Sequence, residues 1–123
     1  MKRGISVVPI KFCLHLKGAP YTVFVSVFAE DGTVAISHGG VEIGQGINTK
    51  VAQVAAMTLG IPMERIKIKP CSTLTSPNSF PTASSTTSEL NCFVSYRLGV
   101  VLTASPVLHA PAGSHQGLSS NQG

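Results

Sequence analysis

With 123 residues, of which 43% are hydrophobic, the chain can form at most one ordinary domain with an apolar core. Only 11% of the residues are charged, whereas about 25% is typical of soluble domains, so part of the surface is expected to lie against something else; the alternative is a small, apolar and poorly soluble product. The formal net charge is +4, but no basic stripe is interleaved with aromatic residues, which argues against nucleic-acid binding.

The sequence carries no signal for a membrane span, secretion or a metal. No apolar run approaches the ~20 residues that a membrane span needs, and Pro9 and Lys11 interrupt the apolar segment near the start. The three cysteines and four histidines have no spacing typical of a metal or redox site. We therefore expect a cytoplasmic chain with free, buried thiols and no metal held by protein side chains.

The first half of the chain is expected to form three strands and a helix. Residues 5–12 read as a short edge strand, because Pro9 has no N–H to donate. Residues 21–29 and 34–37 alternate around Asp31-Gly32 and predict a β-hairpin. A helix capped by Asn48 or Thr49 follows and ends at Gly60; its expected apolar face is formed by Val51, Val54, Ala55, Thr58 and Leu59.

The second half completes the order β-β-β-α-β-α. Residues 66–69 form a strand, and a second helix from about Ser85 has its apolar face at Leu90, Phe93, Val94 and Leu98. The fold class is α+β: a mixed sheet, made of the hairpin and further strands, with two helices packed on one face. Residues 1–100 are expected to fold, and residues 101–123 form a low-complexity tail that is expected to be disordered.

Gly44-Gln45-Gly46 is the first candidate binding segment. Thr49 stands where a dinucleotide-binding fingerprint needs glycine, and Ile47 stands where a phosphate-binding P-loop needs lysine, so neither nucleotide motif fits. A tight turn without side chains lets a ligand approach the backbone, and the Gln45 amide can donate and accept hydrogen bonds. The glycines also fit a plain strand-to-helix turn in which they only relieve strain.

The second candidate segment is hydroxyl-rich and contains Ser84, Ser85, Thr86 and Thr87. One of these residues is expected to cap the second helix. The others exceed the need for a cap and, with the helix N-terminal amides, could bind a phosphate or a pterin. Two such loops in one short chain suggest a bulky anionic cofactor held between two helix starts.

Together these segments resemble the molybdopterin-binding domain of the xanthine dehydrogenase/aldehyde oxidase family. The resemblance keeps one register from about residue 2 to residue 98. It includes Lys2-Arg3-Gly4-Ile5, Val8-Pro9-Ile10-Lys11, Asp31-Gly32-Thr33-Val34, His38-Gly39-Gly40, Glu42, Gly44-Gln45-Gly46, Thr49-Lys50, Gln53-Val54-Ala55, Ile61-Pro62, Ser72-Thr73, Pro77-Asn78, Thr82 and Leu90-Asn91. Residues 1–100 therefore look like an incomplete molybdopterin-binding domain, a fragment of a molybdenum-dependent oxidoreductase.

The resemblance implies where a molybdenum–molybdopterin cofactor would bind. Ile43, Gly44, Gln45 and Gly46 would contact it on one side, and Ser84, Ser85, Thr86 and Thr87 would form the opposing loop. The metal would be held by the cofactor's dithiolene sulfurs and not by protein side chains. The resemblance also implies hydroxylation of an aldehyde or an N-heterocycle such as a purine, in a homodimeric enzyme whose other parts bind [2Fe–2S] clusters and FAD.

Several features of the family are absent from these residues. The family's glutamate base lies in a glycine-rich motif nearer its C-terminus, which matches none of Glu30, Glu42, Glu64 and Glu89. No catalytic residue is therefore assigned, and the isolated chain is expected to be inactive. Ser84 stands where alanine or glycine is usual, which leaves the substrate open. The alternatives are a stand-alone α+β module that binds an anionic ligand through the same loops, and a product without a stable fold.

Overall fold

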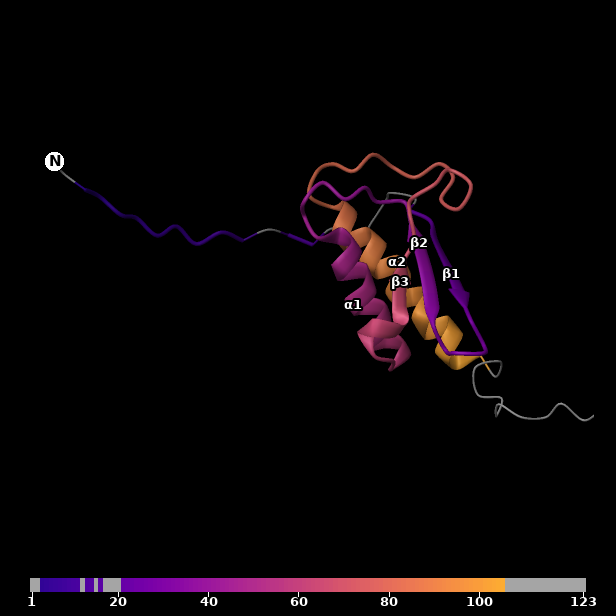
Figure 1. The fold of residues 1–123 in the computed structure, drawn as a ribbon. Helices are drawn as coiled ribbons and strands as arrows, with labels where there is room; N and C mark the ends of the chain where they lie inside the picture. Colours follow the sequence, from indigo (N-terminus) through magenta and orange to yellow (C-terminus); the bar gives the residue numbers. More distant parts are fainter. Residues whose placement is uncertain (1–2, 12, 15, 17–20, 106–123) are drawn as a thin grey trace, which may run out of the picture.

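The computed structural model describes residues 3–11, 13–14, 16 and 21–105. The expected α+β class, with a three-stranded mixed sheet and two helices, is confirmed. The elements in chain order are β1 (Val23–Val27), β2 (Val34–His38), α1 (Ile47–Leu59), a 3-10 turn η1 (Met63–Arg65), β3 (Ile66–Ile68) and α2 (Thr87–Ala104) (Figure 1).

The sheet has the order β1-β2-β3 and is mixed. β1 and β2 form the predicted antiparallel hairpin, with Val25 opposite Ile36. Its turn is fixed by Asp31, whose carboxylate accepts hydrogen bonds from the Thr33 N–H at 2.8 Å and the Thr33 hydroxyl at 2.7 Å. β3 pairs with β2 in parallel, with Ile36 opposite Ile68. A parallel pair needs a long crossover, and α1 supplies it.

The core lies between the inner face of the sheet and the two helices, which cover the same face (Figure 1). Val34, Ile36 and Ile66 from the sheet pack against α1, whose buried positions are Ile47, Val51, Ala52, Ala55 and Ala56. Gly60 ends α1 in the left-handed region at φ +68°, as the sequence predicts, because glycine adopts this conformation without a steric penalty.

The buried face of α2 is small and polar, which differs from the expected apolar stripe. Its buried residues are Thr87, Leu90, Asn91, Ser95 and Gly99, whereas Phe93, Val94 and Leu98 are half-buried. A β-carbon on Gly99 would lie 2.7 Å from Thr58 Cγ2 of α1. The helices therefore approach closely at this point, and only a residue without a side chain fits between them.

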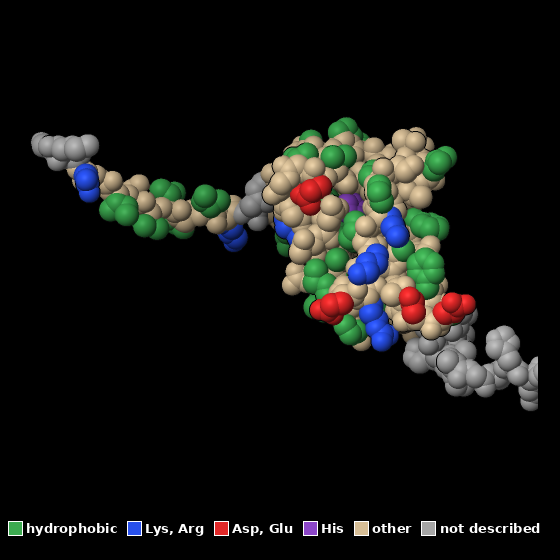
Figure 2. All heavy atoms as spheres, in the orientation of Figure 1, with side chains coloured by type: hydrophobic (Ala, Val, Ile, Leu, Met, Phe, Trp, Pro, Cys, Tyr) green, Lys and Arg blue, Asp and Glu red, His purple; other side chains and the backbone are tan. Residues whose placement is uncertain are grey.

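The strand expected at residues 5–12 is absent from the described part of this segment, residues 5–11. These residues extend away from the body, and their hydrophobic side chains face outward (Figure 2). Ile5 is 98% exposed and Ile10 is 92% exposed. A strand requires hydrogen bonds to a neighbouring strand, and no described strand pairs with this segment.

α2 continues to Ala104, beyond the boundary that was expected at residue 100. Residues 101–104 are therefore helical, and the expectation of disorder is wrong for them. The helix ends at Ser105, which is extended at ψ 132° and precedes Pro106, because the residue before a proline avoids the helical region. The rest of the predicted tail, residues 106–123, lies outside the described residues. Within the described chain, no helix has both the length and the apolar character that crossing a membrane requires.

Candidate cofactor-binding site

The loop between β2 and α1 is organised around the carboxylate of Glu42. Its Oε1 accepts hydrogen bonds from the N–H groups of Gly44 at 3.1 Å and Gly46 at 2.9 Å, and its Oε2 accepts one from the Asn48 N–H at 3.2 Å. These hydrogen bonds, first those from Gly46 and Asn48, hold the pKa of Glu42 below its ordinary value. The start of α1 is thus occupied by an anion from this chain.

The expected caps of α1, Asn48 and Thr49, lie inside the helix instead. Gly46 is the N-cap residue, at φ +74°, and it has no side chain to cap with. Glu42 supplies the missing acceptor from outside the helix. The amides of Gly46 and Asn48 at the start of α1 bond to Glu42 and are therefore not free to bind an anion.

Gln45 closes the same loop with both ends of its amide. Its Oε1 accepts from the Ile43 N–H at 2.7 Å, and its Nε2 donates to the Val41 carbonyl at 2.8 Å. The Ile43 side chain is 71% exposed. Gly44 has φ +96°, a conformation that favours glycine. Gln45 therefore has a structural role in the loop, which sequence reasoning missed.

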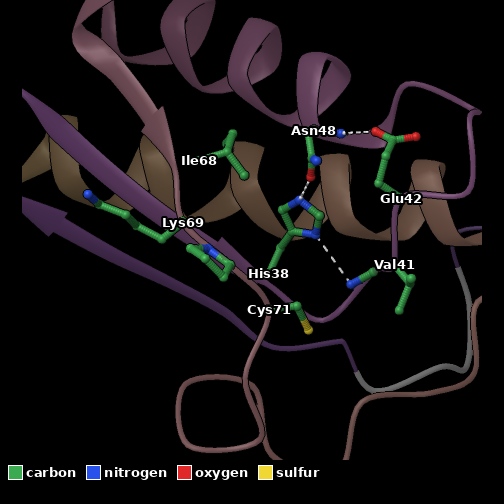
Figure 3. Close-up of a pocket in the computed structure, with 9 residues that line it drawn as sticks. His38, Val41, Glu42, Asn48, Ile68, Lys69 and Cys71 are labelled. Atoms are coloured by element: carbon green, nitrogen blue, oxygen red, sulfur yellow. Dashed lines mark hydrogen bonds between the residues drawn. The ribbon is translucent and has the colours of Figure 1, made fainter.

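His38 links the end of β2 to the first turn of α1 (Figure 3). Its side chain is buried, and its Nδ1 accepts a hydrogen bond from the Gly40 N–H at 3.2 Å. The proton therefore lies on Nε2, which donates to Asn48 Oδ1 at 2.9 Å. Burial lowers the pKa of His38, and the Asn48 hydrogen bond and the Glu42 charge oppose this only in part. The spacing of His38 in the sequence had suggested an isolated histidine.

We expect the stability of the chain to fall as the pH drops below about 6.5, the ordinary pKa of histidine. The folded pKa of His38 is depressed, so the unfolded chain binds more protons in this range. The stability that neutral His38 contributes is fully present above the pKa of histidine in the unfolded chain. It is lost as the pH falls through the lower pKa of His38 in the folded chain. Protonation of Nδ1 would also set an N–H against the Gly40 N–H.

Melting temperatures between about pH 5 and pH 7.5 measure this loss. His38→Gln should flatten the pH dependence in that range. The carboxyl groups of Asp31 and Glu42 titrate at lower pH, because hydrogen bonds depress the pKa of each. The same pH dependence in both proteins would show that His38 is not responsible.

The second loop, which precedes α2, uses its hydroxyl groups in different ways. Thr86 is in the N-cap position, as expected for one of the four residues, but its side chain makes no capping hydrogen bond. Thr87 is buried, and its Oγ1 lies 3.0 Å from the Tyr21 hydroxyl and accepts from the Ala83 N–H at 3.2 Å. Ser84 and Ser85 are exposed and have φ values of +58° and +55°, which are uncommon for residues other than glycine.

Two hydrogen bonds place the second loop beside its neighbours. The Val41 N–H donates to Thr82 Oγ1 at 2.9 Å, across 41 positions of sequence. The Tyr21 hydroxyl lies 3.1 Å from the Pro81 carbonyl, to which it donates, and so ties the second loop to the entrance of β1. Both loops lie at the same end of the two helices (Figure 1).

A pocket of about 420 Å³ lies between the two loops. Of the predicted site residues, Ile43, Gln45, Ser84, Ser85 and Thr87 line it, whereas Gly44, Gly46 and Thr86 do not. Sequence reasoning assigned no binding role to the other lining residues, which are Lys50, Thr82, Ala83, Ser88 and Glu89. Lys50 brings a cation to the pocket; its backbone N–H bonds to the Gly46 carbonyl at 3.0 Å, one helical turn away.

The residues of this pocket fit a cofactor rich in oxygen and nitrogen, and its two charged lining side chains, Lys50 and Glu89, have opposite signs. Ser84 and Ser85 present exposed hydroxyl groups, and Lys50 presents a positive charge. A β-carbon built on Gly44 or Gly46 would meet nothing within 4 Å in this chain. The loop backbone is therefore open to close approach by another molecule.

A second pocket, of about 350 Å³, lies beside residues 40–42 of the first loop (Figure 3). His38, Glu42, Lys69 and Cys71 are among its lining residues. Among the residues that the structure describes, no group of three or more His, Cys, Asp or Glu side chains could hold a metal ion. The expectation of buried thiols is wrong for Cys13 and Cys71, which are exposed.

Comparison with known proteins agrees with the geometry. A sequence model of the molybdopterin cofactor-binding domain matches residues 1–95. The chain is 48% identical over 95 residues to a xanthine dehydrogenase from Drosophila pseudoobscura pseudoobscura, and 45% identical over 95 residues to aldehyde oxidase 3 from Mus musculus. A xanthine dehydrogenase from Oryza sativa subsp. japonica is 47% identical over 96 residues. The first two matches each cover 73% of this chain, and the third covers 72%.

The described residues form an α+β unit with a pocket between two loops, an arrangement typical of a ligand-binding domain. The family match makes this specific: the chain belongs to the molybdopterin cofactor-binding domain family. It spans about 7% of the length of the curated relatives it matches, so it corresponds to a fragment of those proteins.

Proposed function

We propose that this chain supplies one wall of a molybdopterin site and that the pocket between its two loops takes part of the cofactor. One observation carries the proposal: Ile43 and Gln45 line the same pocket as Ser84 and Ser85, although the two loops are about 40 residues apart. The direct hydrogen bond from Val41 to Thr82 supports a fixed distance between the two loops.

Different parts of the pocket would contact the cofactor in different ways. The Ser84 and Ser85 hydroxyl groups would hydrogen-bond to its polar atoms, and Lys50 would balance its negative charge. Beside the pocket, the open backbone at Gly44 and Gly46, which do not line it, would allow close approach of the cofactor. When bound, the molybdenum centre would supply the redox chemistry of hydroxylation at carbon, with the metal held by the cofactor's own sulfurs.

The activity of a whole enzyme with these residues is part of the same proposal. The matched relatives are named as xanthine dehydrogenases and an aldehyde oxidase, which supports an aldehyde or a purine-like N-heterocycle as substrate. [2Fe–2S] clusters and FAD would be bound by other parts of such an enzyme, which would be a cytoplasmic homodimer. These 123 residues alone are expected to be inactive, since a placed carboxylate base contributes about 10²–10⁴-fold to proton transfer.

Gln45→Ala tests the assignment of the first loop. The experiment uses a full-length relative in which residues 1–98 of this chain replace the matching segment. The substitution removes both amide hydrogen bonds that shape the loop. Loss of such bonds costs about 1–3 kcal/mol, so we expect retention of molybdenum to weaken about 5- to 150-fold. Elemental analysis of molybdenum per folded protein, with a melting curve, measures the effect.

Gln53→Ala is the matched control, because Gln53 is exposed on α1 and lines neither pocket of the first loop. It should leave the molybdenum content unchanged. If Gln45→Ala also keeps full molybdenum and full activity, the first loop does not bind the cofactor. A lower melting temperature with full molybdenum per folded molecule would assign Gln45 to the fold alone.

A further inference from the structure

Glu42 has a place in the first loop that is separate from the pocket between the loops. It lines the second pocket, beside His38 and Asn48 (Figure 3), and it is not among the residues that line the pocket with Ile43 and Gln45. Glu42 would therefore influence the cofactor indirectly, through the loop backbone whose N–H groups bond to its carboxylate.

Three backbone N–H groups at alternate positions of the chain, two in the loop and one in α1, converge on the Glu42 carboxylate. Gly44 and Gly46 share Oε1, and Asn48 in the first turn of α1 bonds to Oε2. Gly44 and Gly46 have φ values of +96° and +74°, and their N–H groups face the carboxylate. An anion at a helix N-terminus is favoured by the exposed N–H groups and by the helix dipole. The loop is thus held by hydrogen bonds from within this chain.

We propose that Glu42 is a positioning residue, which presets the first loop and closes the start of α1 to the anionic cofactor. This inference rests on the proposed function of the loops. With the α1 start occupied, the anionic part of the cofactor is directed to the side of the pocket that is lined by Lys50, Ser84 and Ser85. The first loop then contacts the cofactor through Ile43, through Gln45 and through the bare glycine backbone.

The first test uses the full 123-residue chain and ¹H–¹⁵N NMR spectra recorded over a pH titration. The amide signals of Gly44, Gly46 and Asn48 should shift together, with one midpoint below 4.5, the ordinary pKa of the carboxyl group. The other ionisable groups that line these two pockets are His38, Lys69 and Cys71 in the second pocket and Lys50 and Glu89 in the pocket between the loops; Glu89 is the one carboxyl group among them, and Glu89→Gln should leave the shared shift intact. Glu42→Gln should abolish the shared shift, and Glu64→Gln, at an exposed position in η1, should leave it intact.

The second test measures molybdenum per folded protein in the full-length relative that carries residues 1–98. Glu42→Gln should lower it about tenfold, the change expected when a charge-assisted hydrogen bond is lost. Glu42→Asp keeps the charge and should restore part of the loss, whereas Glu64→Gln should have no effect. Full molybdenum in Glu42→Gln would overturn the inference, whatever the spectra of the shorter chain show.

The two tests separate this inference from the proposed function. If the three amides do not titrate together while Gln45→Ala loses molybdenum, the positioning role of Glu42 is wrong and the cofactor loop stands. If the amides titrate together and both Gln45→Ala and Glu42→Gln keep full molybdenum, the loop is preset by Glu42 but does not serve this cofactor.

Discussion

Replacing Ile47 with alanine should lower the free energy of unfolding by about 2–5 kcal/mol. Ile47 is the first residue of α1 and is 0% exposed. It belongs to the core cluster, and its Cδ1 lies directly against Gly40, where an added β-carbon would be 2.4 Å away. Removal of this side chain leaves a cavity beneath the first loop, because neither Gly40 nor the helix can fill the space.

Ile43→Ala is the matched control, because Ile43 lies four positions earlier, in the first loop. Ile43 is 71% exposed, so its truncation should change the free energy of unfolding by no more than about 0.5 kcal/mol. Urea titrations of both variants give the two values. Equal losses of stability in the two variants would contradict the packing of Ile47. In the full-length relative, Ile43→Ala should instead weaken cofactor retention, because Ile43 lines the pocket between the loops.

Gly44→Val should reduce both stability and molybdenum content in the full-length relative that carries residues 1–98. At φ +96°, a β-branched residue is strained, at a cost of about 1–3 kcal/mol. An added β-carbon meets nothing within 4 Å in this chain, so the expected strain comes from the backbone conformation. The open space that it enters is where the proposed cofactor would approach, and we expect about a tenfold or greater loss of molybdenum per folded protein.

Gly60→Val separates the two effects. Gly60 also has a positive φ, +68°, with nothing within 4 Å of an added β-carbon, but it lies at the other end of α1. The Gly60→Val variant should therefore lose a comparable amount of stability but keep its molybdenum content per folded protein. Melting curves with elemental analysis compare the variants. If Gly44→Val keeps the same molybdenum per folded protein as Gly60→Val, the cofactor does not approach this loop.

The hairpin and the end of α1 were predictable because each depends on neighbouring residues. Strand alternation has a period of two residues, and Asp31 and Thr33 bond across the turn between the strands. Gly60 ends α1 because the chain there needs a left-handed residue. Local pattern and local structure agree at these sites, and no distant contact changes the outcome.

The expected strand at residues 5–12 and the expected face of α2 failed for a shared reason. Strand propensity cannot supply a pairing partner, and the described chain provides none for residues 5–11. In α2, Gly99 is buried where Thr58 of α1 comes close to it, Asn91 lies against Gly40 before the first loop, and Ser95 is buried between them on the same face. The Ser95 hydroxyl donates to the Asn91 carbonyl at 2.8 Å, so this polar group is buried without losing its hydrogen bond.

The sequence by itself determined the α+β class, the hairpin and the presence of two small-residue loops before the helices, and the tertiary structure brought these loops to one pocket. The tertiary structure decided which groups in those loops are free to bind. It placed Glu42 at the start of α1, turned Thr87 toward Tyr21, and brought Lys50 into the pocket. Hydrogen-bond partners are chosen among groups that the fold brings within about 3 Å, and Tyr21 and Thr87 are 66 positions apart, so no local pattern could have assigned them.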